Sequence, residues 1–380
     1  MGWFDEKKVG ILDPEGLEKN PLTGKKEYSE TYKKAAKGWS TLPVYLSGAE
    51  RLIDVIRENR VMVFESGTGS GKTVLIPKFA LHATNYKGRV VVTVPKQLIA
   101  SGHAKYNAKL MDATLGVEVG FKHRNSKLEE EDAEIKGDDS SSSDDTKLLF
   151  ATGGTLVGIL NNNPSLDGYS VVIIDEAHER GTDVDETLLF MREALKLNKN
   201  LKLIVMSATL PNRQLFLDYF EDFDPYYETL SSKSNQPVKI NHSDKNYIKQ
   251  KDAITESVNI LFNKIVSKKK EGDILIFVIS KGMGDKILDE VKKRDPTIFT
   301  RVLDKSNRGE DLDIVTSDTL YKDYDDPKQR RPPKGWSRKV VAGTNVAESS
   351  VTIDGLVFVI DNGMELKSDF DPEKQKSSLN

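Results

Sequence analysis

One glycine-rich octapeptide constrains the fold of this chain more than any other feature. It follows a short apolar run at residues 61–65, precedes an apolar helical pattern, and reads Ser66-Gly67-Thr68-Gly69-Ser70-Gly71-Lys72-Thr73. Glycines let the backbone curl, so that successive N–H groups and the helix N-terminus point at phosphate oxygens. In such a loop Lys72 reaches the β- and γ-phosphates of a nucleotide, and the Thr73 hydroxyl binds Mg²⁺. The first position, where Gly or Ala is usual, is the still small Ser66. Spacing, the Lys-Thr pair and the strand–helix context all disfavour a ligand-free turn.

The rest of the chain alternates short apolar runs with longer amphipathic stretches, as expected for a parallel sheet covered by helices. Five runs are predicted strands of a first unit: 61–65, 89–94, 147–151, 171–175 and 202–206. A second series has strands at 273–279, 339–343 and 356–361, with helical patterns at 254–268 and 284–293. The sequence therefore predicts an α/β fold of two similar units, with a boundary in the polar residues 231–236.

Two segments depart from this alternation. Residues 1–41 show no sustained period, and we interpret them as a mostly irregular N-terminal extension. Residues 128–145 hold nine acidic residues and four consecutive serines. Such a stretch cannot bury enough apolar surface to offset its ordering entropy, so it is predicted to be a disordered acidic insertion.

Composition excludes several classes of protein. The 380 residues include 56 basic and 59 acidic side chains, so no global basic field favours nucleic acid and any such binding is local. The absence of cysteine excludes disulfides and zinc fingers, and His103 and His123 lack ligand spacing. Apolar runs are far too short to cross a membrane, and the N-terminus has no signal-peptide pattern. An intracellular location is expected, cytoplasmic or nuclear, or in a virion if the chain is viral.

Two adjacent carboxylates, Asp175 and Glu176, follow the apolar run that ends at residue 174. They should reach the carboxyl edge of the sheet, where the phosphate loop also emerges. Adjacent carboxylates repel each other unless a cation offsets them. With Lys72 and Thr73 nearby, we expect Asp175 to hold Mg²⁺, partly through water, and Glu176 to orient or deprotonate an attacking water. Alone, such a pair could simply cap the next helix.

The tetrad Asp-Glu-Ala-His at 175–178 resembles the DEAH-box helicases of superfamily 2, and other motifs follow in that family's order. They lie at 93–97, 151–156, 207–210 and, in the closest match, 344–355. The family typically has two arginines where Lys96 and Gln97 stand, and an Asp where Gly153 stands. The resemblance covers about residues 42–363. It implies two RecA-like domains with mostly parallel sheets flanked by helices, at 42–230 and 231–380, the second incomplete.

The resemblance also implies roles for residues. ATP with Mg²⁺ would bind between the domains, on residues 66–73 with Asp354 near the sugar, and single-stranded RNA or DNA would lie across both. Catalytic residues would be Lys72, Asp175, Glu176 and His178, and Thr73 and Asp175 would hold the metal. Ser207 and Thr209, with His178, would couple nucleotide state to domain closure. Backbone contacts would come from Thr93, Lys96, Thr155 and Thr344. For the threonines, packing at strand ends is the alternative.

A basic segment at 328–339 carries six basic residues and Trp336. Positive charge beside an aromatic side chain suits neutralisation of a nucleic-acid backbone and stacking on a base. An exposed, proline-stiffened connection with solvated charges explains the same pattern equally well.

The predicted function is that of an ATP-dependent helicase or translocase core, with RNA favoured over DNA by the resemblance alone. The family's arginine-rich last motif is expected after 344–355, and it is missing from these 380 residues. Arginine fingers contribute roughly 10³ to 10⁵ in rate, so we expect weak hydrolysis from this chain alone and a C-terminal helicase portion beyond residue 380 as a partner. The alternative is a nucleotide-gated nucleic-acid-binding module, or a helicase fragment, with little hydrolysis. An ATPase acting on protein is disfavoured by 344–355.

Overall fold

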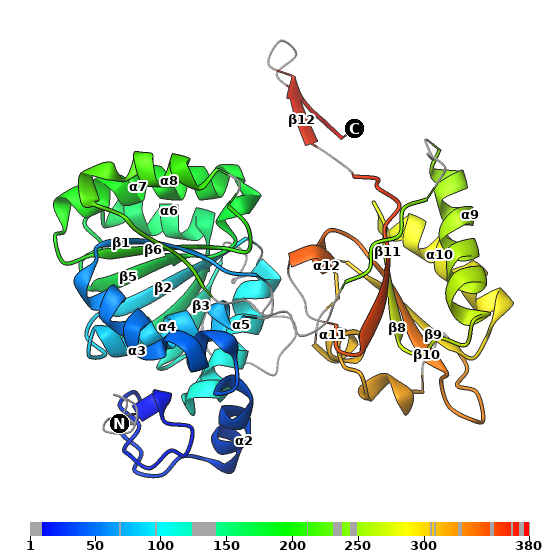
Figure 1. Ribbon diagram of the computed structural model, residues 1–380, viewed down its shortest axis with the longest axis horizontal. Helices are drawn as coiled ribbons and strands as arrows, with labels where there is room; N and C mark the ends of the chain where they lie inside the picture. Colours follow the sequence, from blue (N-terminus) through cyan, green and yellow to red (C-terminus); the bar gives the residue numbers. More distant parts are fainter. Residues whose placement is uncertain are drawn as a thin grey trace. The chain divides into compact units, whose positions relative to one another are not determined.

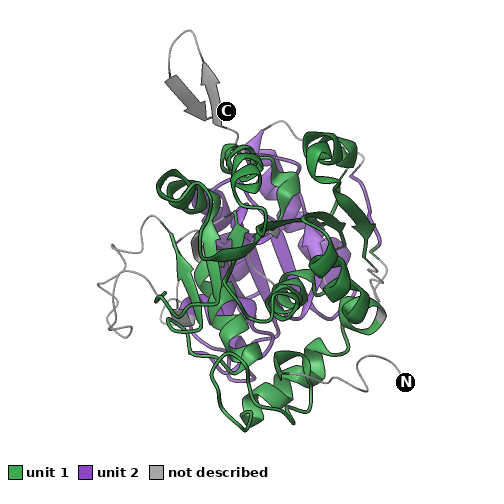
Figure 2. Cartoon of the chain, turned by 90° about the vertical axis from the view of Figure 1, so that its left-hand side faces the viewer, with its two compact units in different colours: residues 1–238 green, residues 239–380 purple. Residues whose placement is uncertain are grey.

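A computed structural model describes most of the chain: residues 10–67, 70–95, 97–123, 142–210, 212–230, 238–243, 249–304, 306–307, 309–325, 329–349, 353–365, 368–371 and 376–379. The chain divides into two compact units, Met1–Val238 and Lys239–Asn380 (Figure 2). The predicted boundary at 231–236 and residues 128–141 of the predicted insertion lie outside the described residues. Among the residues that the structure describes, no helix combines the length and apolar character needed to cross a bilayer.

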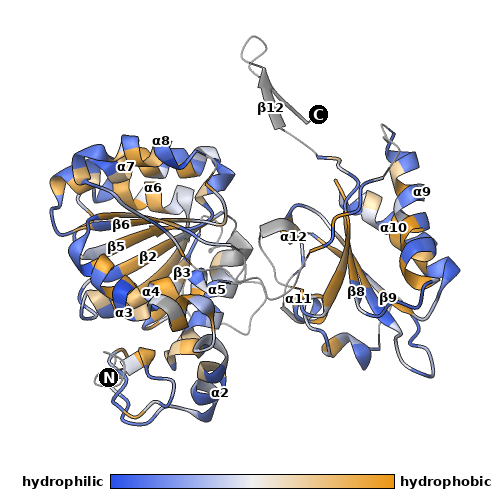
Figure 3. Cartoon of the chain, viewed as in Figure 1, coloured by the Kyte–Doolittle hydropathy of each residue, from blue (hydrophilic) through white to orange (hydrophobic). Residues whose placement is uncertain are grey.

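The first unit is built on a seven-stranded parallel sheet in the order β3-β4-β2-β5-β6-β1-β7 (Figure 1). The strands are β1 (Val61–Glu65), β2 (Arg89–Val94), β3 (Val119–Lys122), β4 (Leu148–Thr152), β5 (Tyr169–Ile174), β6 (Lys202–Ser207) and β7 (Tyr226–Thr229). The inner strands are mostly apolar and buried along their middle residues, because helices cover both faces of a parallel sheet (Figure 3). The five predicted strands are confirmed, and β3 and β7 add two edges that the sequence did not predict.

Helices cover both faces of this sheet. One face packs against α3 (Pro43–Glu58), α4 (Lys72–Ala83) and α5 (Gln97–Met111). The other packs against α6 (Gly153–Asn162), α7 (Thr182–Leu197) and α8 (Arg213–Tyr219). Short 3₁₀ turns lie at η2 (Ala177–Glu179) and η3 (Glu221–Phe223). Side chains alternate between the two cores along each strand, as in any sheet covered on both sides.

The N-terminal segment differs from the irregular extension that we expected. It forms η1 (Gly10–Leu12) and α2 (Glu30–Trp39), which joins the core of the first unit through Tyr32 and Trp39. The Trp39 ring lies 3.9 Å from Nζ of Lys78, which is fully buried in α4 and donates to the Leu110 carbonyl at 2.9 Å. Aromatic packing, which has no period in sequence, therefore orders Glu30–Trp39.

The second unit has a four-stranded parallel sheet in the order β11-β8-β10-β9. Its strands are β8 (Asp273–Phe277), β9 (Ile298–Leu303), β10 (Arg338–Gly343) and β11 (Leu356–Ile360). One face packs against α9 (Gln250–Ile260), η4 (Leu261–Val266) and α10 (Lys281–Arg294), and the other against α11 (Gly309–Thr316) and α12 (Val346–Ser349). A 3₁₀ turn, η5 (Leu320–Lys322), follows α11, and β12 (Ser368–Asp371) pairs antiparallel with β13 (Lys376–Leu379). The predicted α/β class is confirmed in both units.

Trp336 corrects the stacking interpretation of the basic segment. Its indole is 7% exposed, packs edge-on against Phe299 at 5.4 Å between centroids, and donates to the Tyr324 carbonyl at 3.0 Å. Lys339 is also fully buried, and its ammonium donates to two carbonyls at the end of α11. Both side chains are therefore structural, while Arg330 and Lys334 remain solvent-exposed.

Candidate nucleotide-binding site

The phosphate loop joins β1 to α4 at the carboxyl edge of the first sheet. Within it the structure describes Ser66, Gly67 and residues 70–73, while Thr68 and Gly69 lie outside the described residues. Gly71 has φ +92°, and a Cβ there would lie 2.6 Å from the Leu42 side chain. Only glycine fits this position, and α4 begins directly after it at Lys72. The first turn of α4 thus presents Lys72 and Thr73 at its N-terminus.

The structure brings the predicted carboxylates to this helix N-terminus. Asp175 and Glu176 follow β5, and the Asp175 N–H donates to the Thr93 carbonyl at 3.2 Å. The Thr73 hydroxyl donates to Asp175 Oδ2 at 2.8 Å, and Lys72 Nζ lies 3.4 Å from Glu176 Oε1. Two pairs of adjacent residues, about 100 positions apart in sequence, therefore form one cluster of hydroxyl, ammonium and carboxylate groups.

Burial controls the electrostatics of Glu176. Burial raises the pKa of this carboxyl, as does the charge of Asp175, while Lys72 and His178 act in the opposite direction. The Glu176 backbone adopts φ +53°, a left-handed conformation that is costly for a side chain with a Cβ. Strain of this kind persists where the surroundings fix a side chain in place. Glu176 is therefore a carboxylate with raised proton affinity, held in one position.

Unsatisfied groups in the loop fit an anionic ligand. The hydroxyl oxygens of Ser66 and Ser70 are buried, and neither has a hydrogen-bond partner in the described part of the chain. A buried polar group without a partner costs about 1–3 kcal/mol, which a phosphate oxygen accepting from each hydroxyl would remove. Thr73 and Asp175 offer the hard oxygen ligands that Mg²⁺ prefers. No group of three or more His, Cys, Asp or Glu in the described ranges forms a metal site, and Mg²⁺ on a nucleotide needs only one or two carboxylates.

The predicted coupling residues adjoin Glu176. His178 Nδ1 lies 3.0 Å from Ser207 Oγ and 3.4 Å from Glu176 Oε2. Ser207 is fully buried and donates its single proton to the Thr209 carbonyl at 2.7 Å, so Nδ1 is the donor toward Ser207. The Ser66 N–H also donates to the Ser207 carbonyl. The end of β6 is thus bonded to both the phosphate loop and the η2 turn.

The predicted nucleic-acid contacts lie at strand ends or at the start of a helix, in two different units. Thr93 is 4% exposed, which favours the alternative of strand-end packing for its side chain. Thr155 lies in the first turn of α6, with its hydroxyl 2.8 Å from that of Thr152, and Lys96 lies outside the described residues. In the second unit Thr344 follows β10, and its N–H donates to the Leu303 carbonyl. Asp354 precedes β11, so it lies at the opposite edge of that sheet from Thr344.

The sequence analysis missed Glu65, the last residue of β1. Its carboxylate accepts from the Leu210 N–H at 3.3 Å and from the Tyr227 hydroxyl at 2.7 Å. Glu65 therefore joins the start of the phosphate loop to the 207–210 motif and to β7. An acidic residue at the end of an apolar strand, directly before the loop, was the available signal.

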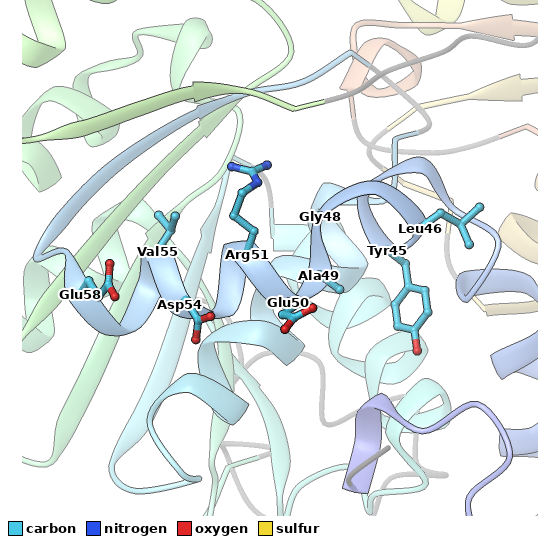
Figure 4. A pocket seen from close by; sticks show the side chains of 9 residues that line it. All are labelled: Tyr45, Leu46, Gly48, Ala49, Glu50, Arg51, Asp54, Val55 and Glu58. Carbon is cyan, nitrogen blue, oxygen red and sulfur yellow. The ribbon is translucent and has the colours of Figure 1, made fainter. Parts of the chain in front are cut away.

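A surface pocket of about 510 Å³ lies along α3 (Figure 4). Its lining comes from α3 alone and includes Arg51, which forms a bidentate ion pair with Glu228 of β7, and the carboxylates of Glu50, Asp54 and Glu58. None of the predicted site residues lines it.

Comparison with known proteins agrees with this geometry. Residues 47–216 match the DEAD/DEAH box helicase family. The chain is 37% identical over 372 residues to the putative ATP-dependent RNA helicase L540 of Acanthamoeba polyphaga mimivirus, covering 97% of this chain and 49% of that protein. It is 31% identical over 344 residues to the ATP-dependent RNA helicase HrpA of Borreliella burgdorferi, covering 89% and 37%. The Escherichia coli DEAH/RHA helicase HrpB has a similar structure, with TM-score 0.71 and 24% identity, over 89% of this chain and 39% of that one.

The chain spans half or less of the length of these relatives. Its match to the family model runs from within α3 to within α8, and it includes the elements that hold the phosphate loop and the Asp-Glu-Ala-His tetrad. The chain therefore carries a DEAD/DEAH box helicase domain.

Proposed function

We propose that this chain is the core of an ATP-dependent helicase or translocase that acts on RNA. The single observation that carries the proposal is the cluster of Lys72, Thr73, Asp175 and Glu176 at one edge of the sheet. The two curated relatives are named as ATP-dependent RNA helicases, which supports RNA as the substrate.

Each residue of the cluster has a distinct task in this proposal. Lys72 and the N–H groups of the loop bind the nucleotide phosphates, and Ser66 and Ser70 donate hydroxyl hydrogen bonds to them. Thr73 and Asp175 would hold Mg²⁺, which neutralises charge on the phosphates. Glu176 accepts the proton of the attacking water, since its raised pKa makes it a better base than an ordinary carboxylate.

Coupling to nucleic acid would run through the His178–Ser207 contact. Because His178 Nδ1 lies near both Ser207 and Glu176, a change at the carboxylate alters the bond to Ser207. Ser207 is bonded in turn to Thr209 and to the loop. Thr155 and Thr344 would hold the sugar-phosphate backbone, which gives a grip independent of base sequence.

The test is ATP hydrolysis by the purified chain with no polymer, with single-stranded RNA and with single-stranded DNA. We expect stimulation by RNA, and loss of hydrolysis in Glu176→Gln but not in the exposed control Glu186→Gln. Stimulation by DNA alone would contradict the RNA assignment. ATP-dependent retention of RNA without hydrolysis would instead identify a nucleotide-gated binding module, the alternative function.

A further inference from the structure

The N-termini of α6 and α7 lie so close together that Gly153 has no room for a side chain. A Cβ at this position would lie 2.9 Å from Asp183 Cβ and 3.1 Å from the Asp183 carbonyl oxygen. That oxygen belongs to the first turn of α7 and accepts from the Thr187 hydroxyl at 2.6 Å, so it cannot move aside alone. The Asp183 side chain therefore fills the space that a side chain at 153 would take.

This packing places a carboxylate at the start of α6. Asp183 Oδ2 lies 3.5 Å from where a Cβ of Gly154 would be. The side chain is exposed, and no described residue bonds to its carboxylate, whereas Asp185 pairs with Arg180. Thr152, the N-cap of α6, makes no side-chain cap hydrogen bond. The field of the free N–H groups at the start of α6 thus acts on a full negative charge.

Thr155 lies in the first turn of α6, and the Asp183 carboxylate of α7 packs beside that turn at Gly154. One turn rises 5.4 Å, so the carboxylate lies well within the roughly 10 Å screening length at 0.1 M salt from anything that Thr155 contacts. We propose that Asp183 limits how tightly the first turn of α6 holds a nucleic-acid phosphate. The inference rests on the proposed function, in which Thr155 contacts the backbone. A phosphate approaching this turn meets a like charge in the helix field that would otherwise attract it.

A weak grip suits a protein that moves along a strand. Each step requires release of the backbone, and a bound phosphate held by a bare helix N-terminus would be released slowly. In this proposal Asp183 favours exchange of the strand over tight capture.

The first test changes the charge without changing the shape. We compare Asp183→Asn with Glu186→Gln, an exposed acidic residue of the same helix that gives the same change in net charge. Fluorescence anisotropy with a labelled single-stranded oligouridylate reports affinity. At low salt we expect about twofold tighter binding for Asp183→Asn, about fourfold for Asp183→Lys, and no change for Glu186→Gln. The gain should vanish at high salt, where screening removes the repulsion.

The second test moves the carboxylate between helices. Gly153→Asp alone should lower the melting temperature, because its Cβ overlaps that of Asp183, and Asp183→Gly alone should bind RNA about twofold more tightly. The double variant restores a single carboxylate beside the first turn of α6, so it should return to the original affinity. It should regain only part of the melting temperature lost in Gly153→Asp, because the contact of the new Cβ with the Asp183 backbone carbonyl remains.

Several results would overturn the inference. If Asp183→Asn binds RNA more weakly than the unaltered chain, or equally to Glu186→Gln, Asp183 does not limit the grip. A double variant no better than Gly153→Asp would show that the two side chains do not share one space. If neither the unaltered chain nor Asp183→Asn binds RNA, the proposed function itself fails. If all variants bind RNA with the affinity of the unaltered chain, only the inference about Asp183 fails.

Discussion

Replacing Trp336 with alanine should destabilise the second unit without weakening nucleic-acid binding. The indole packs against Phe299 at 5.4 Å, donates to the Tyr324 carbonyl, and belongs to a core cluster with Ile314 and Tyr321. Deleting a buried ring of this size removes its transfer free energy and leaves a cavity. The expected loss is about 3–5 kcal/mol in the free energy of unfolding.

Trp336→Phe separates the two contributions. Phenylalanine keeps most of the ring contact with Phe299 but leaves the Tyr324 carbonyl without its donor, which costs about 1–3 kcal/mol. Urea unfolding followed by circular dichroism measures both variants. Lys334→Ala, an exposed residue of the same connection, is the matched control and should change stability by less than about 0.5 kcal/mol.

RNA affinity decides between the core and the stacking interpretations. A ring that is 7% exposed has no free face for a base, so Trp336→Ala, assayed under conditions where it stays folded, should bind oligonucleotides as the unaltered chain does. Base stacking is worth about 1–3 kcal/mol for each base, and alanine would abolish it. An affinity that falls tenfold in folded Trp336→Ala would refute the reasoning.

Three further changes test the first unit. Glu176→Gln should lower the rate of hydrolysis by about 10² to 10⁴ while ATP binding persists, measured by single-turnover kinetics and nucleotide titration. Gly153→Ala should lower the free energy of unfolding by about 1–3 kcal/mol, because the new Cβ overpacks against Asp183. A loss of stability no larger than that of Gly154→Ala would contradict the contact. Burial lowers the pKa of Lys78 well below its usual range, so the unfolded chain binds the Lys78 proton more readily than the folded chain does. The free energy of unfolding therefore rises with pH until the pH reaches the pKa of lysine in the unfolded chain, about 10.4. Lys78→Met should flatten that rise between pH 8 and 10. An unchanged slope would show that a group other than Lys78 causes the pH dependence.

Apolar runs predicted the inner strands because those strands are buried on both faces, and burial on both faces leaves an unambiguous pattern. Two strands of the first unit that the sequence analysis missed, β3 and β7, lack this pattern. β7 reads Tyr-Tyr-Glu-Thr at an edge of its sheet, and β3 is a four-residue edge strand with Gly120 in it. Half-buried edges mix polar and apolar residues, so their sequence resembles that of a loop.

The nucleotide-site cluster was predictable because two strand ends specify it. Residues that directly follow parallel strands meet at one edge, whatever the details of packing. The contacts of Glu65, the left-handed backbone of Glu176 and the meeting of Gly153 with Asp183 depend on how loops and helices pack. No spacing in the sequence encodes these distances, so they require the structure.

The 344–355 motif has residues at both edges of the second sheet. Thr344 follows β10 and Asp354 precedes β11, and both strands run parallel to β8 between them. With about 3.3 Å per residue along the five residues of β8, the two positions lie on the order of 15 Å apart. Thr and Asp side chains are too short to reach one common group across that distance, so the two residues cannot contact the same group of a ligand. Separate roles, with backbone contact at Thr344 and nucleotide contact at Asp354, are therefore the arrangement that the geometry allows if both residues bind.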